Sequence, residues 1–284
     1  MGNKLGIDLG GTKIEAIVIN DAFQVVERKR IATNREEGYD AILQRIVNLA
    51  KELIETGNVE GPVGICTPGA IDYKTGTLKN SNTVCLIDKP LQSDLESALS
   101  LPLLMENDAN CFALSEAMDG AAKNYNVVFG IIIGSGTGGG VVINKKIIRG
   151  ANYVSGEWGH LPLPIFGNLN DKKYVKNKIS QMQIQKFTSG KGLENLYHKK
   201  ITAREIFNKS NKSVFIKQFK IRLARALVNV IYTLDPDIFV FGGGLSNEIS
   251  SFTEIKKMVA KNMELKNINT KFKITIYHAN INNI

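Results

Sequence analysis

Two glycine-rich turns hold the residues of this sequence that are best suited to chemistry. The first, Asp8-Leu9-Gly10-Gly11-Thr12-Lys13, follows the apolar run Leu5-Gly6-Ile7. The second, GSGTGGG at 134–140, follows the apolar run 127–133. Glycine lets a backbone turn tightly and approach a ligand closely, and successive N–H groups in such turns bind anions. Two such turns about half a chain apart predict a duplicated fold that grips one polyphosphate.

Each turn alone is more often a plain β-hairpin turn than a phosphate site. Neither matches the P-loop pattern or a strict dinucleotide fingerprint. Both turns, however, place a threonine beside glycine, and the first adds the carboxylate of Asp8. A carboxylate there would hold Mg²⁺, usually through water, because this ion keeps several waters in proteins.

The composition is that of an ordinary globular protein and predicts one or two domains. The chain has 284 residues, 43% apolar and 22% charged, with a net charge of +9. A basic balance can attract nucleic acid or a membrane surface. The lysines are scattered, with their densest cluster at Lys172, Lys173, Lys176 and Lys178, which favours a solvated surface and neither of those partners.

Cysteine usage and hydropathy predict a cytoplasmic protein. Cys66, Cys85 and Cys111 lie far apart among apolar neighbours, which is typical of thiols in a reducing compartment. We find no apolar signal region at the N-terminus and no apolar run near the length of about 18 residues that spans a membrane.

Hydrophobic periodicity predicts two successive α/β lobes. In the first half we expect strands at 4–9, 13–20, 24–31, 62–66 and 102–105, and helices at 36–56, 92–100 and 108–119. In the second half we expect strands at 127–133, 139–144, 146–149, 238–241 and 272–278, and helices at 213–234 and 247–263. Strands followed by alternating helices and strands, occurring twice, predict two lobes with a cleft between them. We place the lobes at 1–117 and 118–284, with an irregular excursion at 165–186.

Seven ordered motifs make the chain resemble the ROK sugar kinases of the actin-like ATPase superfamily. They are GIDLGGTKIEAIV at 6–18, CTPGAID at 66–72, LKNSN at 78–82, ENDANCFALSEA at 106–117, IIIGSGTGGGVV at 131–142, SGEWGHLPLP at 155–164 and LDPDIFVFGGGLSN at 234–247. The resemblance implies a duplicated α/β fold of the actin-like (ribonuclease H-like) class. Within the family, three motifs are most similar to bacterial fructokinases, with N-acetylglucosamine kinases and glucokinases as near alternatives.

The resemblance also implies a site residue by residue. ATP would contact Asp8, Gly10, Gly11, Thr12, Lys13, Gly134, Ser135, Gly136, Thr137, Gly138, Gly243 and Gly244, with Mg²⁺ at Asp8. A hexose would contact Gly69, Asn82, Asn107, Glu157, His160 and Gln185. Asp108 would be the catalytic base that accepts the proton of the sugar hydroxyl during phosphoryl transfer.

These residues also have ordinary structural interpretations. Asp108 is equally suited to cap the helix that begins there. Asn82 and Asn107 are common turn residues. The glycines at 242–244 fit a tight strand-to-helix turn, with Ser246 as the cap of the next helix.

Three departures from the family pattern bear on function. Many members carry three cysteines that bind a structural zinc together with the histidine, and those positions here are Lys176, Lys178 and Gln183. Because zinc needs thiolate or imidazole ligands, we expect no zinc. The acidic sugar ligand of the family falls on the neutral Gln185, and the chain stops before the family's final helix, at Ile284. A smaller departure, beyond these three, is Ser135 where threonine is usual.

The sequence therefore predicts an ATP-dependent hexose 6-kinase, a fructokinase first, with N-acetylglucosamine or glucose as alternative substrates. A catalytically weakened sugar-binding protein is the second hypothesis, motivated by the three departures. A sugar-responsive repressor is disfavoured, because the first phosphate turn begins at residue 8 and leaves no room for a DNA-binding extension. The resemblance makes a homodimer plausible without indicating its interface.

Overall fold

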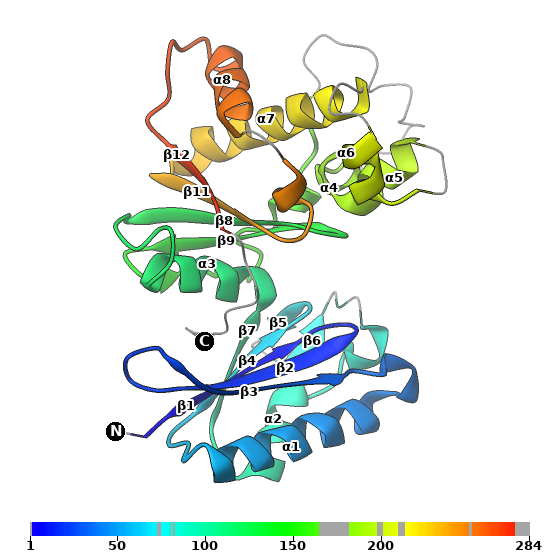
Figure 1. Ribbon diagram of the computed structural model, residues 1–284, viewed down its shortest axis with the longest axis vertical. Coiled ribbons are helices and arrows are strands. Elements are labelled where there is room, and N and C mark those ends of the chain that lie inside the picture. The colour runs from blue at the N-terminus through cyan, green and yellow to red at the C-terminus, as the bar shows by residue number, and fades with distance from the viewer. Residues whose placement is uncertain are drawn as a thin grey trace. The chain divides into compact units, whose positions relative to one another are not determined.

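The computed structural model describes residues 2–72, 75–79, 81, 83–164, 182–197, 201–209, 214–249 and 252–275. The chain divides into two compact units (Figure 1). The first contains residues 2–115 and Gly150–Val154, and the second contains Glu116–Arg149 and the described residues from Ser155 onward.

The first unit is built on a five-stranded sheet in the order β3-β2-β1-β4-β7. Its strands are β1 (Lys4–Leu9), β2 (Lys13–Ile19), β3 (Val25–Ala32), β4 (Val63–Thr67) and β7 (Leu103–Asn107). β1, β2 and β3 form an antiparallel meander, and β4 and β7 continue the sheet in parallel with β1. The edge strand β3 carries Arg28, Lys29 and Arg30, and such charges discourage pairing with another chain.

The second unit repeats this topology with different residues. Its order is β10-β9-β8-β11-β12, from β8 (Val127–Ile133), β9 (Thr137–Ile143), β10 (Lys146–Ile147), β11 (Ile238–Gly242) and β12 (Lys271–Ile274). β8, β9 and β10 are antiparallel neighbours, and β11 and β12 run parallel to β8. The predicted duplication is confirmed strand by strand.

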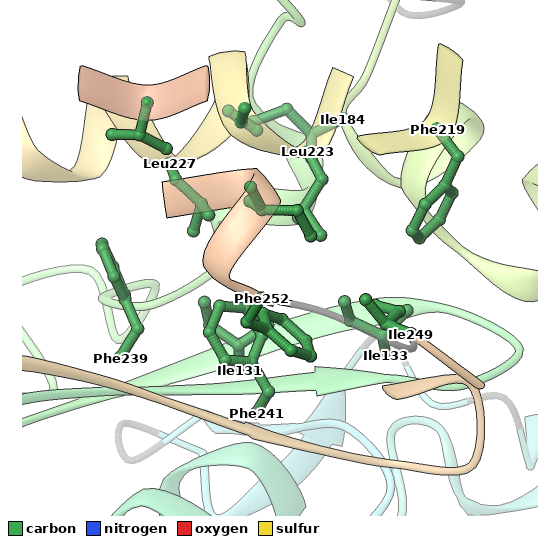
Figure 2. Packing of buried hydrophobic residues seen from close by; sticks show 14 of the residues in the cluster. Ile131, Ile133, Ile184, Phe219, Leu223, Leu227, Phe239, Phe241, Ile249 and Phe252 are labelled. Atoms are coloured by element: carbon green, nitrogen blue, oxygen red, sulfur yellow. The ribbon is translucent and has the colours of Figure 1, made fainter. Parts of the chain in front are cut away.

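Helices cover each sheet and bury its apolar face. In the first unit, α1 (Tyr39–Thr56) and α2 (Leu91–Leu99) pack against the sheet, and in the second unit α7 (Val214–Leu234) and α8 (Phe252–Asn262) do so (Figure 1). Figure 2 shows Leu223 and Leu227 of α7 directed toward the strands that carry Ile131 and Phe241. The rings of Phe241 and Phe252 lie 4.2 Å apart between their centroids. The strand β11, which lies between β8 and β12 and runs parallel to both, is buried along its whole length.

The remaining elements differ most from the sequence predictions. The loop expected after residue 66 contains a small hairpin of β5 (Ala70–Asp72) and β6 (Thr77–Lys79). The helices α4 (Gln185–Thr188), α5 (Gly190–Tyr197) and α6 (Ala203–Lys209) were not expected from the periodicity. The helix predicted at 247–263 begins later, at Phe252, so Ser246 is not its cap. Ser246 instead lies in a short 3-10 turn and donates its hydroxyl to the carbonyl of Gly242 at 2.6 Å.

Of the described helices, none combines the length and the apolar character that crossing a bilayer requires.

Candidate functional site

The first glycine turn joins β1 to β2 at the carboxyl end of β1. The N–H of Gly10 donates to the carbonyl of Lys13 at 2.9 Å, and a Cβ at Gly10 would lie 2.8 Å from that same oxygen. A larger residue therefore cannot replace Gly10 without opening the turn. Buried Thr33, which the sequence analysis missed, donates its hydroxyl to the carbonyl of Gly10 at 2.7 Å. The turn is held rigidly, while Thr12 and Lys13 stay exposed.

Asp8 lies in a row of ionisable side chains that crosses the sheet. It pairs in register with Glu15 of β2 and Cys66 of β4, and Cys66 pairs with Glu106 of β7. Residues paired across neighbouring strands point to the same face of a sheet. The pKa of Asp8 is raised from 3.8 to about 6, first by burial and then by the charges of Asp108 and Glu15, while Arg30 lowers it. Asp8 thus carries a carboxylate at neutral pH that a cation would stabilise.

Asp108 stands at the carboxyl end of β7 as the first residue of α3 (Asp108–Met118). It is exposed, and its Oδ1 accepts the N–H of Ala109 at 2.8 Å. Asn107 accepts that N–H as well, at 2.9 Å, so the capping role considered for Asp108 is shared with the residue before it. Asn107 also donates its amide to the carbonyl of Gly69 at 3.2 Å. Asn107 therefore fixes the loop after β4 next to Asp108.

The backbone conformation at position 69 requires glycine. Its φ is +134°, and a Cβ there would lie 2.6 Å from the carbonyl oxygen of Lys79. Because β1, β4 and β7 are parallel, their carboxyl ends meet at one edge of the sheet, where ligands bind in α/β proteins. The structure thus brings together Asp8, Gly10, Gly11, Thr12, Gly69, Asn107 and Asp108 at that edge. Asn82, the other predicted sugar ligand of this unit, lies outside the described residues.

Two further residues beside the first turn were not singled out from the sequence. The position of a Cβ at Gly11 is 3.5 Å from the hydroxyl of Thr83 and 3.8 Å from the guanidinium of Arg35. Thr83 is fully buried, and Arg35 is exposed. Sequence reasoning missed both because they come from segments far from the glycine turn in the chain.

The second glycine turn lies at the carboxyl end of β8 in the second unit. The N–H of Gly134 donates to the carbonyl of Gly136 at 3.0 Å, and Ser135 and Gly136 are exposed. A Cβ at Gly134 would meet no atom within 4 Å, so this backbone is open to a ligand. Thr137 is buried, and its hydroxyl pairs with that of Thr188 at 3.2 Å. Its side chain therefore anchors the turn, and Gly138 accepts the indole N–H of Trp158 at 3.0 Å.

The glycines after β11 lie beside this turn. Leu245 donates its N–H to the carbonyl of Ile133 at 3.0 Å, and a Cβ at Gly243 would lie 2.6 Å from that carbonyl oxygen. Gly243 has a φ of +86°, which favours glycine. Gly244 is exposed, with open space where a Cβ would be. The second unit therefore brings the predicted nucleotide-binding glycines 134–138, 243 and 244 to one edge of its sheet.

Glu157 and His160 lie on a loop of the same unit. Trp158–His160 form a 3-10 turn, and buried Trp158 anchors it against Phe129 with ring centroids 5.8 Å apart. His160 Nε2 lies 3.4 Å from Glu157 Oε2, and the two side chains are 56% and 40% exposed. They present an imidazole and a carboxylate to solvent, which is chemistry suited to neighbouring hydroxyl groups. Gln185 Nε2 lies 3.5 Å from His160 Nδ1.

The residues around His160 do not fit the zinc that the family pattern implies. Of the three former cysteine positions, Lys176 and Lys178 lie outside the described residues, and Gln183 places its side-chain amide 3.4 Å from His160 Nδ1. The described residues include no group of three histidine, cysteine, aspartate or glutamate side chains arranged to hold a metal. An amide and an ammonium group are not zinc ligands, so the donor chemistry disagrees with the zinc site.

The two repeated sheets, each with a glycine turn at the carboxyl end of a parallel strand, define an α/β protein of the actin-like ATPase fold class. Solved structures agree with this fold. A ROK hexokinase from Thermus thermophilus has a TM-score of 0.79 at 24% identity, covering 99% of this chain and 95% of its own. A ROK family glucokinase from Streptomyces griseus, in complex with glucose and AMPPNP, has a TM-score of 0.75 at 22% identity, covering 99% and 97%.

Sequence comparison gives the family. The pattern of the ROK family matches residues 4–283. An N-acetyl-D-glucosamine kinase from Citrobacter koseri is 35% identical over 271 residues, which covers 91% of this chain and 89% of that protein. The chain belongs to the ROK family.

Proposed function

We propose that this protein is an ATP-dependent N-acetylglucosamine kinase that phosphorylates the 6-hydroxyl of the sugar. The observation that carries the proposal is the 35% identity to an N-acetyl-D-glucosamine kinase over nearly the full length of both chains. The fructose specificity expected from the motifs finds no support in these comparisons, and the N-acetylglucosamine alternative is better supported.

The site supports phosphoryl transfer in the first unit. Asp108 would accept the proton of the attacking hydroxyl as the sugar oxygen bonds to the γ-phosphorus and the bond to the ADP oxygen breaks. Its exposure and its position beside the rigid Gly69 loop suit a base that must reach a bound hydroxyl. Asn107 would orient Asp108 through the cap that it provides.

The two cosubstrates fit different features of the chain. The open backbone of Gly134 and Gly244 and the exposed Ser135 and Gly136 fit the phosphates and adenosine of ATP. The half-buried carboxylate of Asp8 fits Mg²⁺, a hard cation with oxygen ligands. When bound, Mg²⁺ neutralises charge on the phosphates. Asp8 would bind Mg²⁺ in its deprotonated form, because only the carboxylate carries the negative charge that attracts the cation.

ADP release with ATP, Mg²⁺ and a panel of N-acetylglucosamine, N-acetylmannosamine, glucose, mannose and fructose tests this proposal. We expect the highest kcat/KM with N-acetylglucosamine and loss of turnover in Asp108→Asn. Higher kcat/KM with fructose would restore the first expectation from the sequence. Sugar binding by calorimetry with no turnover for any sugar would support the non-catalytic alternative, which the neutral Gln185 motivates.

A further inference from the structure

Two glutamine amides in the second unit converge on one ring nitrogen of His160. Gln183 Nε2 lies 3.4 Å from His160 Nδ1, and Gln185 Nε2 lies 3.5 Å from the same nitrogen. Gln185 Nε2 also donates to Gln183 Oε1 at 3.3 Å. Because the oxygen of Gln183 accepts this bond, its nitrogen is the end that faces the ring. Both glutamine side chains therefore direct their NH₂ groups at His160 Nδ1.

The backbone holds these side chains in place. Pro162 and Gln183 form an antiparallel bridge between the loop after His160 and the segment before α4. Leu163 donates its N–H to the carbonyl of Met182 at 2.7 Å, and Ile184 donates to the carbonyl of Leu161 at 2.8 Å. The two segments are thus tied by their main chains on both sides of Gln183, which places the Cα of Gln183 beside the loop of His160.

Gln185 also connects His160 with the second glycine turn. Its Oε1 lies 3.9 Å from the position that a Cβ at Gly136 would occupy, while its Nε2 faces His160. A Cβ at Gly159, next to His160, would lie 3.5 Å from the Cβ of Gln185 and would collide with the carbonyl oxygen of Thr137. Glycine at 159 therefore allows the loop of His160 to lie directly against the glycine turn and Gln185.

We propose that Gln183 and Gln185 are positioning residues that fix the ring orientation and tautomer of His160. Amide N–H groups donate to Nδ1, so Nδ1 must be unprotonated and the proton of the neutral ring must be on Nε2. That N–H faces Glu157 Oε2 at 3.4 Å. The amide pair thus restrains the ring at Nδ1.

This arrangement has a consequence for the sugar, which rests on the proposed function. With Nδ1 occupied by the amides, the Nε2 edge of His160 and the carboxylate of Glu157 form a fixed donor and acceptor pair. Such a pair matches two neighbouring hydroxyl groups, one that accepts and one that donates. Gln183 would then influence sugar affinity without touching the sugar.

Nitrogen NMR of the ligand-free, full-length protein tests the tautomer directly. The chain has three histidines, so a His160→Ala variant assigns the signal of His160 by difference. Under conditions where the ring is neutral, we expect an unprotonated Nδ1 and a protonated Nε2. Gln183→Glu places a carboxylate acceptor beside Nδ1, and we expect its Nδ1 to become protonated. Lys186→Met, at an exposed position of α4, is the matched control and should keep the wild-type signals.

Steady-state kinetics test the proposed effect of Gln183 on sugar affinity. In Gln183→Leu we expect the KM for the sugar to rise about five- to tenfold, as for the loss of one hydrogen bond, with the KM for ATP and kcat nearly unchanged. A protonated Nδ1 in the wild type overturns the proposal, and so does an unchanged signal in Gln183→Glu. An unchanged sugar KM in Gln183→Leu overturns its consequence for the sugar. If no sugar is phosphorylated at all, the proposed function fails, while the NMR result still decides the tautomer.

Discussion

Replacing Asp8 with asparagine should stabilise the ligand-free protein while removing its activity. Burial, together with the charges of Asp108 and Glu15, raises the pKa of Asp8 from 3.8 to about 6. The folded state therefore binds this proton more tightly than the unfolded state does. The resulting contribution to stability is complete below pH 3.8 and is lost as the pH rises through about 6. The asparagine side chain of the variant would carry no charge at any of these pH values.

The size of the effect follows from the two pKa values. The difference of 2.2 between about 6 and 3.8 corresponds to about 3 kcal/mol at roughly 1.36 kcal/mol for each pKa unit. Because the side chain of Asp8 is only half-buried and water screens part of the repulsion, we expect a gain of about 1–3 kcal/mol in the free energy of unfolding of Asp8→Asn at pH 8. Near pH 4 the gain should disappear.

Urea unfolding followed by circular dichroism at a series of pH values between 4 and 8 measures this difference. The exposed Asp21→Asn, in the turn between β2 and β3, is the matched control and should stay within about 0.5 kcal/mol of the wild type. Our account of the site would be refuted by an Asp8→Asn variant that is less stable than the wild type at pH 8, or by a difference that does not change with pH. The first result would mean that the folded protein stabilises Asp8 as a carboxylate, and the second would mean that the pKa of Asp8 is the same in the folded and unfolded states.

Three further outcomes can be measured independently. Asp108→Asn should lower kcat by about 10²–10⁴-fold in the ADP-release assay while sugar binding by calorimetry persists; unchanged turnover would exclude Asp108 as the base. Gly243→Ala, which forces a side chain into a φ of +86°, should lower the free energy of unfolding by about 1–3 kcal/mol in a urea titration, and a neutral effect would contradict the tight turn after β11. A thiol reagent should modify half-buried Cys85 first, because burial raises the pKa of Cys66 well above its usual range and Cys111 is also buried; rapid modification of all three thiols in the folded protein would contradict this packing.

The sequence was sufficient for the two sheets because their signals are local. Each strand from β1 to β3 and from β8 to β9 is a short apolar or alternating run bounded by glycine or polar turn residues. The buried parallel strands β4 and β11 are short apolar runs followed by Pro68-Gly69 and Gly243-Gly244. The helices α1 and α7 have long apolar stripes, and α7 ends at Leu234 before Asp235-Pro236, as predicted.

The elements that were missed have weak local signals. The hairpin of β5 and β6 has strands of three residues each, and α4 has only four residues, so neither is long enough for a periodic pattern. α8 was predicted to begin at 247 because Ser246 is a common cap residue. The structure uses its buried hydroxyl to bond back to Gly242, since the turn there leaves that carbonyl without a helical partner.

In the candidate site, too, the sequence predicts only part of the arrangement. Sequence motifs place Asp8, Gly69 and Asp108 at strand ends, and parallel strands necessarily bring such ends to one edge. Motifs cannot show that Asn107 is already engaged by two main-chain groups, or that Thr33 anchors the first turn from the end of β3. Those roles depend on contacts between segments that are distant in the chain.

Gln183 shows most clearly why a position can be identified from sequence while its role cannot. Aligning the chain with the zinc motif marks Gln183 as a missing ligand, and from that pattern alone the loop around His160 loses its restraint. The structure places its amide on the ring nitrogen of His160, with a second amide from Gln185 bonded to both. A metal restrains a histidine through one strong bond, whereas two neutral amides do so through several weak ones, each worth about 1 kcal/mol. The cost of losing one amide should therefore be small in stability and visible mainly in the tautomer of His160 and in sugar affinity.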